Sequence, residues 1–256
     1  MSPTTTPTPT PTKAKPGMAR WKKLAIGGGV ALIALVAVGV WWFLRDDAPK
    51  AVSLDAAVGA VDDSTGAASA DGVAGNWTVD TSVGQFSFED STGTFVGFRV
   101  SEELSGIGST TAVGRTPAVS GTMTIDGTKL TATNITADMT QLTTNNSRRD
   151  GPARQALGTS QFPSATFVLT SPIDLGDAAS TGAKTQVTAT GDLTVHGVTK
   201  SVEIPLEAQL TGDTVVVVGS LPVTFSDFGI TAPTAPIVLS VDDHGTMELQ
   251  LFFTRA

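Results

Sequence analysis

From Trp77 to the C-terminus apolar and polar residues alternate, and this pattern limits the possible folds more than any other feature of the chain. Between Val202 and Leu210, for example, every second residue is apolar. A period of two places the apolar side chains of an extended strand on one face, which must then be buried against a partner surface. About eight such strands, separated by Gly, Asp or Pro turns, predict an all-β fold.

Closure into an antiparallel barrel is the simplest way to bury one face of strands this long, because it also removes the open sheet edges. A two-sheet sandwich is the alternative. Residues 146–157 interrupt the strands and predict one inserted helix, with Ser147 as its N-cap. Residues 229–236 predict a loop or short helix, and the Asp-Asp-His cluster at 242–244 predicts a turn before a last strand at 246–254.

The N-terminal part has a different composition. Residues 24–44 carry no charge, and at about 1.5 Å per residue a helix of this length crosses a hydrocarbon core of roughly 30 Å. The segment ends in bulky Trp-Trp-Phe-Leu, a poor cleavage site, so we expect a membrane anchor rather than a cleaved signal peptide. Five basic residues precede it and only Arg45 directly follows it, which predicts a cytoplasmic N-terminus.

These patterns divide the chain into four parts. Residues 1–23 alternate Thr and Pro at the start and predict a disordered cytoplasmic tail, followed by a single transmembrane helix at 24–44. Residues 45–76, rich in Ala, Gly, Asp and Ser, predict a flexible linker, and residues 77–256 predict the barrel. The expected protein is a single-pass protein of the cell membrane whose C-terminal domain lies outside the cytoplasm.

Composition argues against several classes of function. The chain has no cysteine, which excludes disulfides, thiol catalysis and iron–sulfur clusters. His196 and His244 have no partners at metal-ligand spacing. From Arg45 onward 11 basic residues face 24 acidic ones, which disfavours nucleic acid. Since no nucleophile elbow or phosphate loop appears either, we expect no enzymatic activity, cofactor or metal.

One short segment resembles a known family. Residues 189–200, Ala-Thr-Gly-Asp-Leu-Thr-Val-His-Gly-Val-Thr-Lys, form a strand, a Gly turn and the start of a second strand. This sequence resembles the hallmark hairpin of the YceI-like family of lipocalin-like, polyisoprenoid-binding proteins. Three further motifs occur in the family's order: Trp77-Thr-Val-Asp80, Thr144 with Arg149-Asp150, and Phe162-Pro-Ser-Ala-Thr-Phe167.

The sequence departs from the family pattern at two places. Residues 102–116 lengthen one connection, and the inserted helix lacks paired aromatic residues before Phe162. Both changes bear on the shape of any cavity, so the resemblance leaves the size and identity of a ligand open.

The resemblance implies an eight-stranded lipocalin-like barrel around a long-chain isoprenoid or a similar lipid. By itself, the inward alternation fits a barrel filled by its own side chains as well as one lined for a ligand. We therefore expect a membrane-anchored extracytoplasmic protein that sequesters or carries a polyisoprenoid-type ligand. The alternative is an envelope interaction or stress-response module with a filled barrel. Whether the barrel forms a homodimer stays open.

The candidate ligand-binding residues are those that the alternation places inside the barrel. They are Val96, Phe98, Met123, Ile125, Ala137, Met139, Phe167, Leu193, Val195, Ile204, Phe225 and Leu251.

Two cationic residues are candidates for contact with a lipid headgroup. The guanidinium of Arg149 could hold a phosphate through two hydrogen bonds, and the alternative is a structural ion pair or helix cap. Lys200 could meet an anionic headgroup at the rim, and the alternative is a solvated lysine on a strand. We expect His196 to be a solvated or turn-bonded side chain rather than a catalyst.

Overall fold

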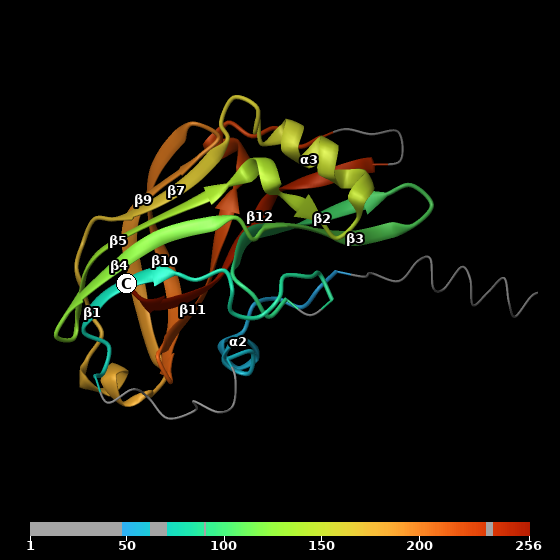
Figure 1. Cartoon of the computed structure of the whole chain (residues 1–256). Helices are drawn as coiled ribbons and strands as arrows, with labels where there is room; N and C mark the ends of the chain where they lie inside the picture. The colour runs from blue at the N-terminus through green and yellow to red at the C-terminus, as the bar shows by residue number, and fades with distance from the viewer. Residues whose placement is uncertain (1–47, 62–70, 90, 234–237) are drawn as a thin grey trace, which may run out of the picture. The chain divides into compact units, whose positions relative to one another are not determined.

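The computed structural model describes residues 48–61, 71–89, 91–233 and 238–256 (Figure 1). The predicted cytoplasmic tail and transmembrane helix lie outside these residues. Within the described ranges, no helix has the length and apolar character needed to cross a membrane. The membrane anchor at 24–44 therefore stays a prediction.

Eight antiparallel strands close into a barrel, as the alternation predicted. In the order of their hydrogen-bonded neighbours they are β1 (Gly75–Val79), β4 (Val119–Asp126), β5 (Lys129–Asp138), β7 (Ser164–Leu169), β9 (Thr185–Val195), β10 (Val198–Thr211), β11 (Thr214–Thr224) and β12 (Val238–Arg255). The ring closes where β12 pairs with β1, with Phe253 opposite Val79. The barrel is confirmed over the alternative of a two-sheet sandwich.

The strands form because their side chains sort by face. In β10 the inward Ile204 is 2% exposed, whereas its neighbour Glu203 is exposed to solvent. The inward residues of opposite strands meet in one apolar core. This burial, repeated around the ring, fixes the register of each strand, because a shift by one residue would turn the polar face inward.

Further strands extend the sheet beyond the ring. β12 is 18 residues long, so it pairs with β1 near its C-terminus and with β2 (Phe95–Leu104) along its earlier part. β2 forms a long hairpin with β3 (Gly108–Thr116), which reaches beyond the barrel (Figure 1). The two-residue strands β6 (Thr143–Thr144) and β8 (Ile173–Asp174) pair with β3 and β5.

The inserted helix is present but shorter than predicted. It consists of a 3-10 turn, η3 (Ser147–Arg149), and α3 (Asp150–Ala156). The N-cap is Asn146 rather than Ser147, and its side chain accepts a hydrogen bond from the Arg148 backbone. The other short elements are η2 (Met139–Gln141), η4 (Asp177–Thr181) and η5 (Phe225–Phe228).

The predicted turn at residues 242–244 is wrong. These residues lie inside β12, where the register with β2 shifts between Val241 and Gly245. Such an irregularity accommodates unpaired residues within a continuous strand. In the sequence, three consecutive polar residues look like a turn. In the structure the strand continues through them, and the chain does not reverse direction.

The predicted linker, 45–76, contains a helix that the sequence analysis did not anticipate. α2 (Leu54–Val58) begins after Ser53, whose side chain accepts a hydrogen bond from the Ala56 backbone. Leu54, Ala57 and Val61 pack on Val216, Val218 and Phe252, which face outward from β11 and β12. The domain therefore includes residues well before Trp77.

Candidate ligand-binding site

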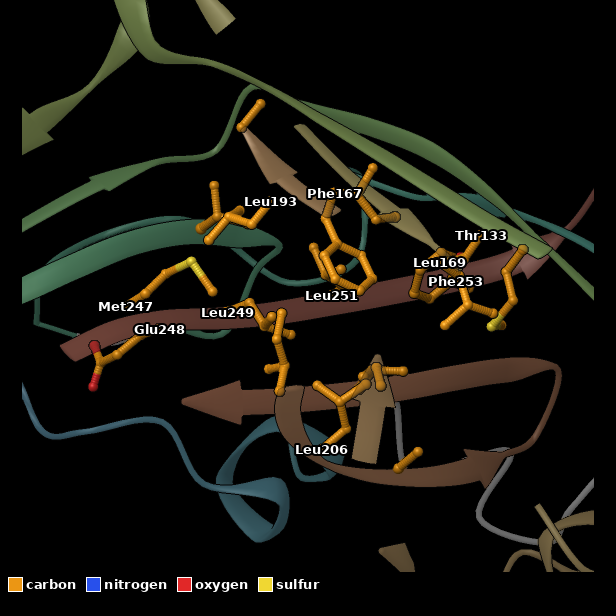
Figure 2. Close-up of a pocket in the computed structure, with 18 of the residues that line it drawn as sticks. Thr133, Phe167, Leu169, Leu193, Leu206, Met247, Glu248, Leu249, Leu251 and Phe253 are labelled. Carbon is orange, nitrogen blue, oxygen red and sulfur yellow. The ribbon is translucent and has the colours of Figure 1, made fainter. Parts of the chain in front are cut away.

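A cavity of about 200 Å³ lies inside the barrel (Figure 2). Ala179 of η4 contributes to its wall at the end where β9 begins, and Phe228 of η5 contributes at the end where β9 finishes. Figure 2 shows Phe167, Leu193 and Leu251, from β7, β9 and β12, extending into the same space. The barrel is therefore not completely filled by its own side chains.

The structure brings all twelve predicted ligand-binding residues together in the cavity wall. They are Val96, Phe98, Met123, Ile125, Ala137, Met139, Phe167, Leu193, Val195, Ile204, Phe225 and Leu251. Ten of them lie on strands, where the period of two turns them inward, whereas Met139 lies in η2 and Phe225 in η5. Contact of the twelve with a ligand stays a prediction.

The wall is almost entirely apolar. Its few polar members are Thr133, Thr166, Thr185, Gln209 and Glu248. Of the described lining residues only Glu248 has an ionisable side chain, and its carboxylate points away from the cavity (Figure 2). Because burying an unpaired charge is costly, this wall suits an uncharged chain. Among the described residues no cluster of His, Asp or Glu could hold a metal ion.

Glu248 is held on the outer side of the wall by two arginines. Arg99 Nε donates to one carboxylate oxygen at 2.8 Å, and Arg115 Nη2 donates to the other at 3.1 Å. Glu248 and Arg115 are each only 1% exposed. Burial lowers the pKa of Arg115, and the hydrogen bond with Glu248 opposes this shift. The carboxylate of Glu248 thus balances the charge of the buried Arg115, and the more exposed Arg99 adds a second positive charge outside the cavity.

Comparison with known proteins places this barrel in a family. Residues 77–253 match the family model of the YceI-like domain. The chain belongs to the YceI-like family. Protein YceI of Escherichia coli O157:H7 and of Shigella flexneri are each 37% identical over 122 residues, which is 46% of this chain and 56% of each relative. The matched region thus spans little more than half the length of these curated relatives.

A solved structure shares the YceI-like fold. A polyisoprenoid binding domain from Saccharophagus degradans, implicated in plant cell wall breakdown, superposes with a TM-score of 0.52 and 17% sequence identity. The match covers 70% of this chain and 98% of that domain. At this identity the likeness establishes the fold.

Neither predicted headgroup residue lines the cavity of this YceI-like barrel. Arg149 forms an ion pair with Glu102 of β2, which corresponds to the structural alternative. Lys200 Nζ lies 3.1 Å from an oxygen of Asp227 and 6.0 Å from the ring centre of Phe228. Lys200 shares the inward side of β10 with Ile204, but it lies at the rim. A headgroup role for either residue stays untested.

His196 lies in the β9–β10 turn, but its side chain is half-buried and bonds outside that turn, unlike the solvated or turn-bonded side chain that we expected. Its backbone adopts a φ of 52°, and its Nδ1 lies 3.1 Å from the carbonyl oxygen of Phe228. The ring also packs edge-on against Phe162, with 4.9 Å between the ring centres. His196 therefore connects the hairpin to η5 and to the loop after α3.

The sequence analysis missed the residues that close the two ends of the YceI-like barrel. Ala179 in η4, Leu157 after α3, and Phe228 and Ile230 around η5 all line the cavity. None lies on a strand, so the period of two could not identify them. The one available signal was the spacing of apolar residues in Phe225-x-x-Phe228-x-Ile230, within an otherwise polar loop.

Proposed function

We propose that this protein binds the uncharged chain of a long apolar molecule, of the polyisoprenoid type, and keeps it out of water. The observation that carries the proposal is the apolar cavity inside a closed barrel. Burial there is worth about 0.8 kcal/mol for each methylene group removed from water. The polyisoprenoid-binding description of the Saccharophagus degradans domain supports the choice of ligand class.

The proposed mechanism is sequestration without chemistry. The wall offers the ligand hydroxyl and amide groups but no free carboxylate or amine among its described residues. An isoprenoid alcohol or hydrocarbon is thus favoured over a fully enclosed phosphate, because the phosphate would lose its hydration without gaining a charged partner.

The cavity is small for a long ligand, which places a condition on binding. At about 200 Å³ it is smaller than the roughly 300–1,000 Å³ typical of pockets for drug-sized ligands. A long isoprenoid chain therefore needs the cavity to widen or one end to open when the ligand binds.

We further propose that residues 24–44 anchor the protein in the cell membrane, with its N-terminus in the cytoplasm and the barrel outside. The support is the uncharged run with five basic residues before it. Protease added to spheroplasts should digest the barrel or its connection and spare an N-terminal tag. Digestion of that tag would contradict this topology.

A tryptophan placed in the wall tests the binding proposal. Ala137 lines the cavity and is 3% exposed, whereas Ala132 lies on the same strand and is exposed to solvent. Ala137→Trp should reduce binding of retinol, a fluorescent uncharged isoprenoid alcohol, at least tenfold in a titration of the full chain. The overpacking should cost about 1–3 kcal/mol of folding free energy.

Ala132→Trp is the matched control, and it should bind retinol like the wild type. If the folded wild type binds no retinol or longer isoprenoid alcohol, the binding proposal is wrong. The filled-barrel interaction module then becomes the better account.

A further inference from the structure

One end of the cavity is closed by a short segment, Phe225–Ile230, which comprises η5 and the two residues after it; we call it the plug. Phe225, Phe228 and Ile230 all form part of the cavity wall. Phe228 and Ile230 are 5% and 9% exposed, and they pack with Leu193 of β9. The plug thus separates the apolar interior from solvent at this end.

The plug is seated in the barrel by one aromatic side chain in particular. The Phe225 ring meets Phe98 of β2 edge-on, with 6.4 Å between the ring centres. Gly245 of β12 leaves the space for this ring, because a Cβ atom there would lie 2.4 Å from Phe225. These contacts are of the kind that an apolar ligand chain could replace.

Four polar contacts, between three pairs of residues, connect the plug to the rim. Ser226 donates from its backbone nitrogen and its hydroxyl to the two carboxylate oxygens of Asp243, at 2.9 and 2.5 Å. These hydrogen bonds hold the pKa of Asp243 below its ordinary value. Asp227 pairs with Lys200, and the carbonyl of Phe228 lies 3.1 Å from His196 Nδ1.

The contacts of Ser226 and Asp227 are exposed, and only the one between Phe228 and His196 is half-buried. The side chains of Lys200 and Asp227 are 40% and 58% exposed, and pairs at such positions contribute little to stability. The α3 region is held by Arg149 and Glu102, whose side chains are only 22% and 6% exposed. The polar contacts of the plug are therefore weaker than the ion pair that holds the α3 region.

We propose that the plug is the gate through which a lipid enters and leaves the cavity. Thr224 and Gly229 bound η5, and Gly229 has a φ of 68°, a conformation that glycine adopts without strain. Rotation about these two residues withdraws Phe225 and Phe228 and lengthens the cavity, which a long chain requires. This inference rests on the proposed function.

A reversible disulfide across the plug tests the gate. The chain has no cysteine, so the double variant Ser226→Cys/Asp243→Cys offers a single possible disulfide, at a pair whose side chains are already in contact. The full chain in phosphatidylcholine vesicles is loaded with retinol and mixed with acceptor vesicles that carry a quencher. The oxidised protein should transfer retinol at least tenfold more slowly than the same protein after reduction.

The control disulfide lies at the same end but does not involve the plug. Thr194 and Thr199 face each other across the β9–β10 hairpin, with 2.8 Å between their hydroxyl oxygens. In Thr194→Cys/Thr199→Cys, oxidation should leave the transfer rate unchanged. Mass spectrometry establishes that each disulfide has formed.

A second variant tests the gate without a disulfide. Ser226→Ala/Asp227→Asn removes the hydroxyl hydrogen bond to Asp243 and the negative charge that pairs with Lys200, while the backbone hydrogen bond from residue 226 stays. It should speed retinol transfer at least threefold while equilibrium binding is retained.

Equal transfer rates for the oxidised and reduced plug, or an unchanged rate in Ser226→Ala/Asp227→Asn, would overturn the gate. Either result with normal retinol binding leaves the proposed function intact. Failure of every form to bind retinol would instead remove both proposals.

Discussion

At the scale of single residues, the carboxylate of Glu248 stands out because it is buried and carries a charge. It lies between Arg99 and Arg115, while the Phe95 ring lies 4.2 Å from the Arg115 guanidinium carbon. The two arginines also donate to the carbonyl oxygens of Pro49 and Lys50. A single acidic residue thus connects β2, β3 and β12 to the segment before α2.

Glu248→Gln should destabilise the domain by about 3–5 kcal/mol, because it leaves the guanidinium of Arg115 buried without a counter-charge. Asp227→Asn, which breaks the exposed pair with Lys200, is the control and should change stability by less than about 1 kcal/mol. Urea unfolding of the full chain measures both values. If both variants change the free energy of unfolding by a similarly small amount, the buried pair contributes no more to stability than the exposed one.

Sequence alone could not have identified this network. Arg115 and Glu248 are 133 positions apart, and each lies on a strand as a polar residue of ordinary appearance. The alternation at 246–254 places Glu248 on the outward face, whereas Arg115 lies within residues 102–116, which the sequence showed only as a lengthened connection. Their burial depends on Pro49, Lys50 and Ser91, which cover that face only in the folded chain.

At the scale of elements, most long strands and the inserted helix were predictable, whereas the shorter α2 and η5 were not. β10 repeats its alternation over 14 residues, so its face and its ends could be read with little ambiguity. α2 and η5 have five and four residues, too few to establish a period. These short elements nevertheless cover the outer face of β11 and close the cavity. In η5 the sequence analysis named Phe225 as a lining residue and missed Phe228.

A substitution in α2 tests whether this helix belongs to the folded domain. Leu54 is 2% exposed and packs with Val216 and Phe252, so Leu54→Ala should cost about 2–5 kcal/mol. Ala56, on the exposed side of the same helix, is the control, and Ala56→Ser should be nearly neutral. Thermal unfolding of the full chain reports both. Equal melting temperatures would mean that residues 48–61 contribute nothing to the domain.

At the scale of the whole molecule, closure of the barrel depends on one strand with two partners. β12 joins β11 to both β1 and β2. The sequence predicted only its second half, at 246–254, because the polar residues at 242–244 concealed the first half. The closed ring was still predictable, since single-faced strands of this length need it. The pairing of β12 with both β1 and β2 could not be predicted.

The cavity results from the mixture of large and small side chains inside the barrel. Inward positions of the barrel carry aliphatic residues such as Val195 and Leu251 beside small ones such as Ala137 and Ala189, and the small ones leave the space. The resemblance of the hairpin at 189–200 correctly indicated the family. The alternation indicated part of the wall, which other strand residues such as Leu206 and Leu249 also line. Neither could give the volume, which depends on how the ends are closed.

The most direct test of the central claim is the lipid content of the protein taken from its own membrane. The full chain, purified from its native source, is extracted with organic solvent and the extract is analysed by mass spectrometry. Our account predicts an uncharged isoprenoid or similar long-chain lipid at close to one molecule per chain, and its loss in Ala137→Trp but not in Ala132→Trp. An extract without such a lipid, from a folded wild type that also fails to bind isoprenoid alcohols, would contradict the account.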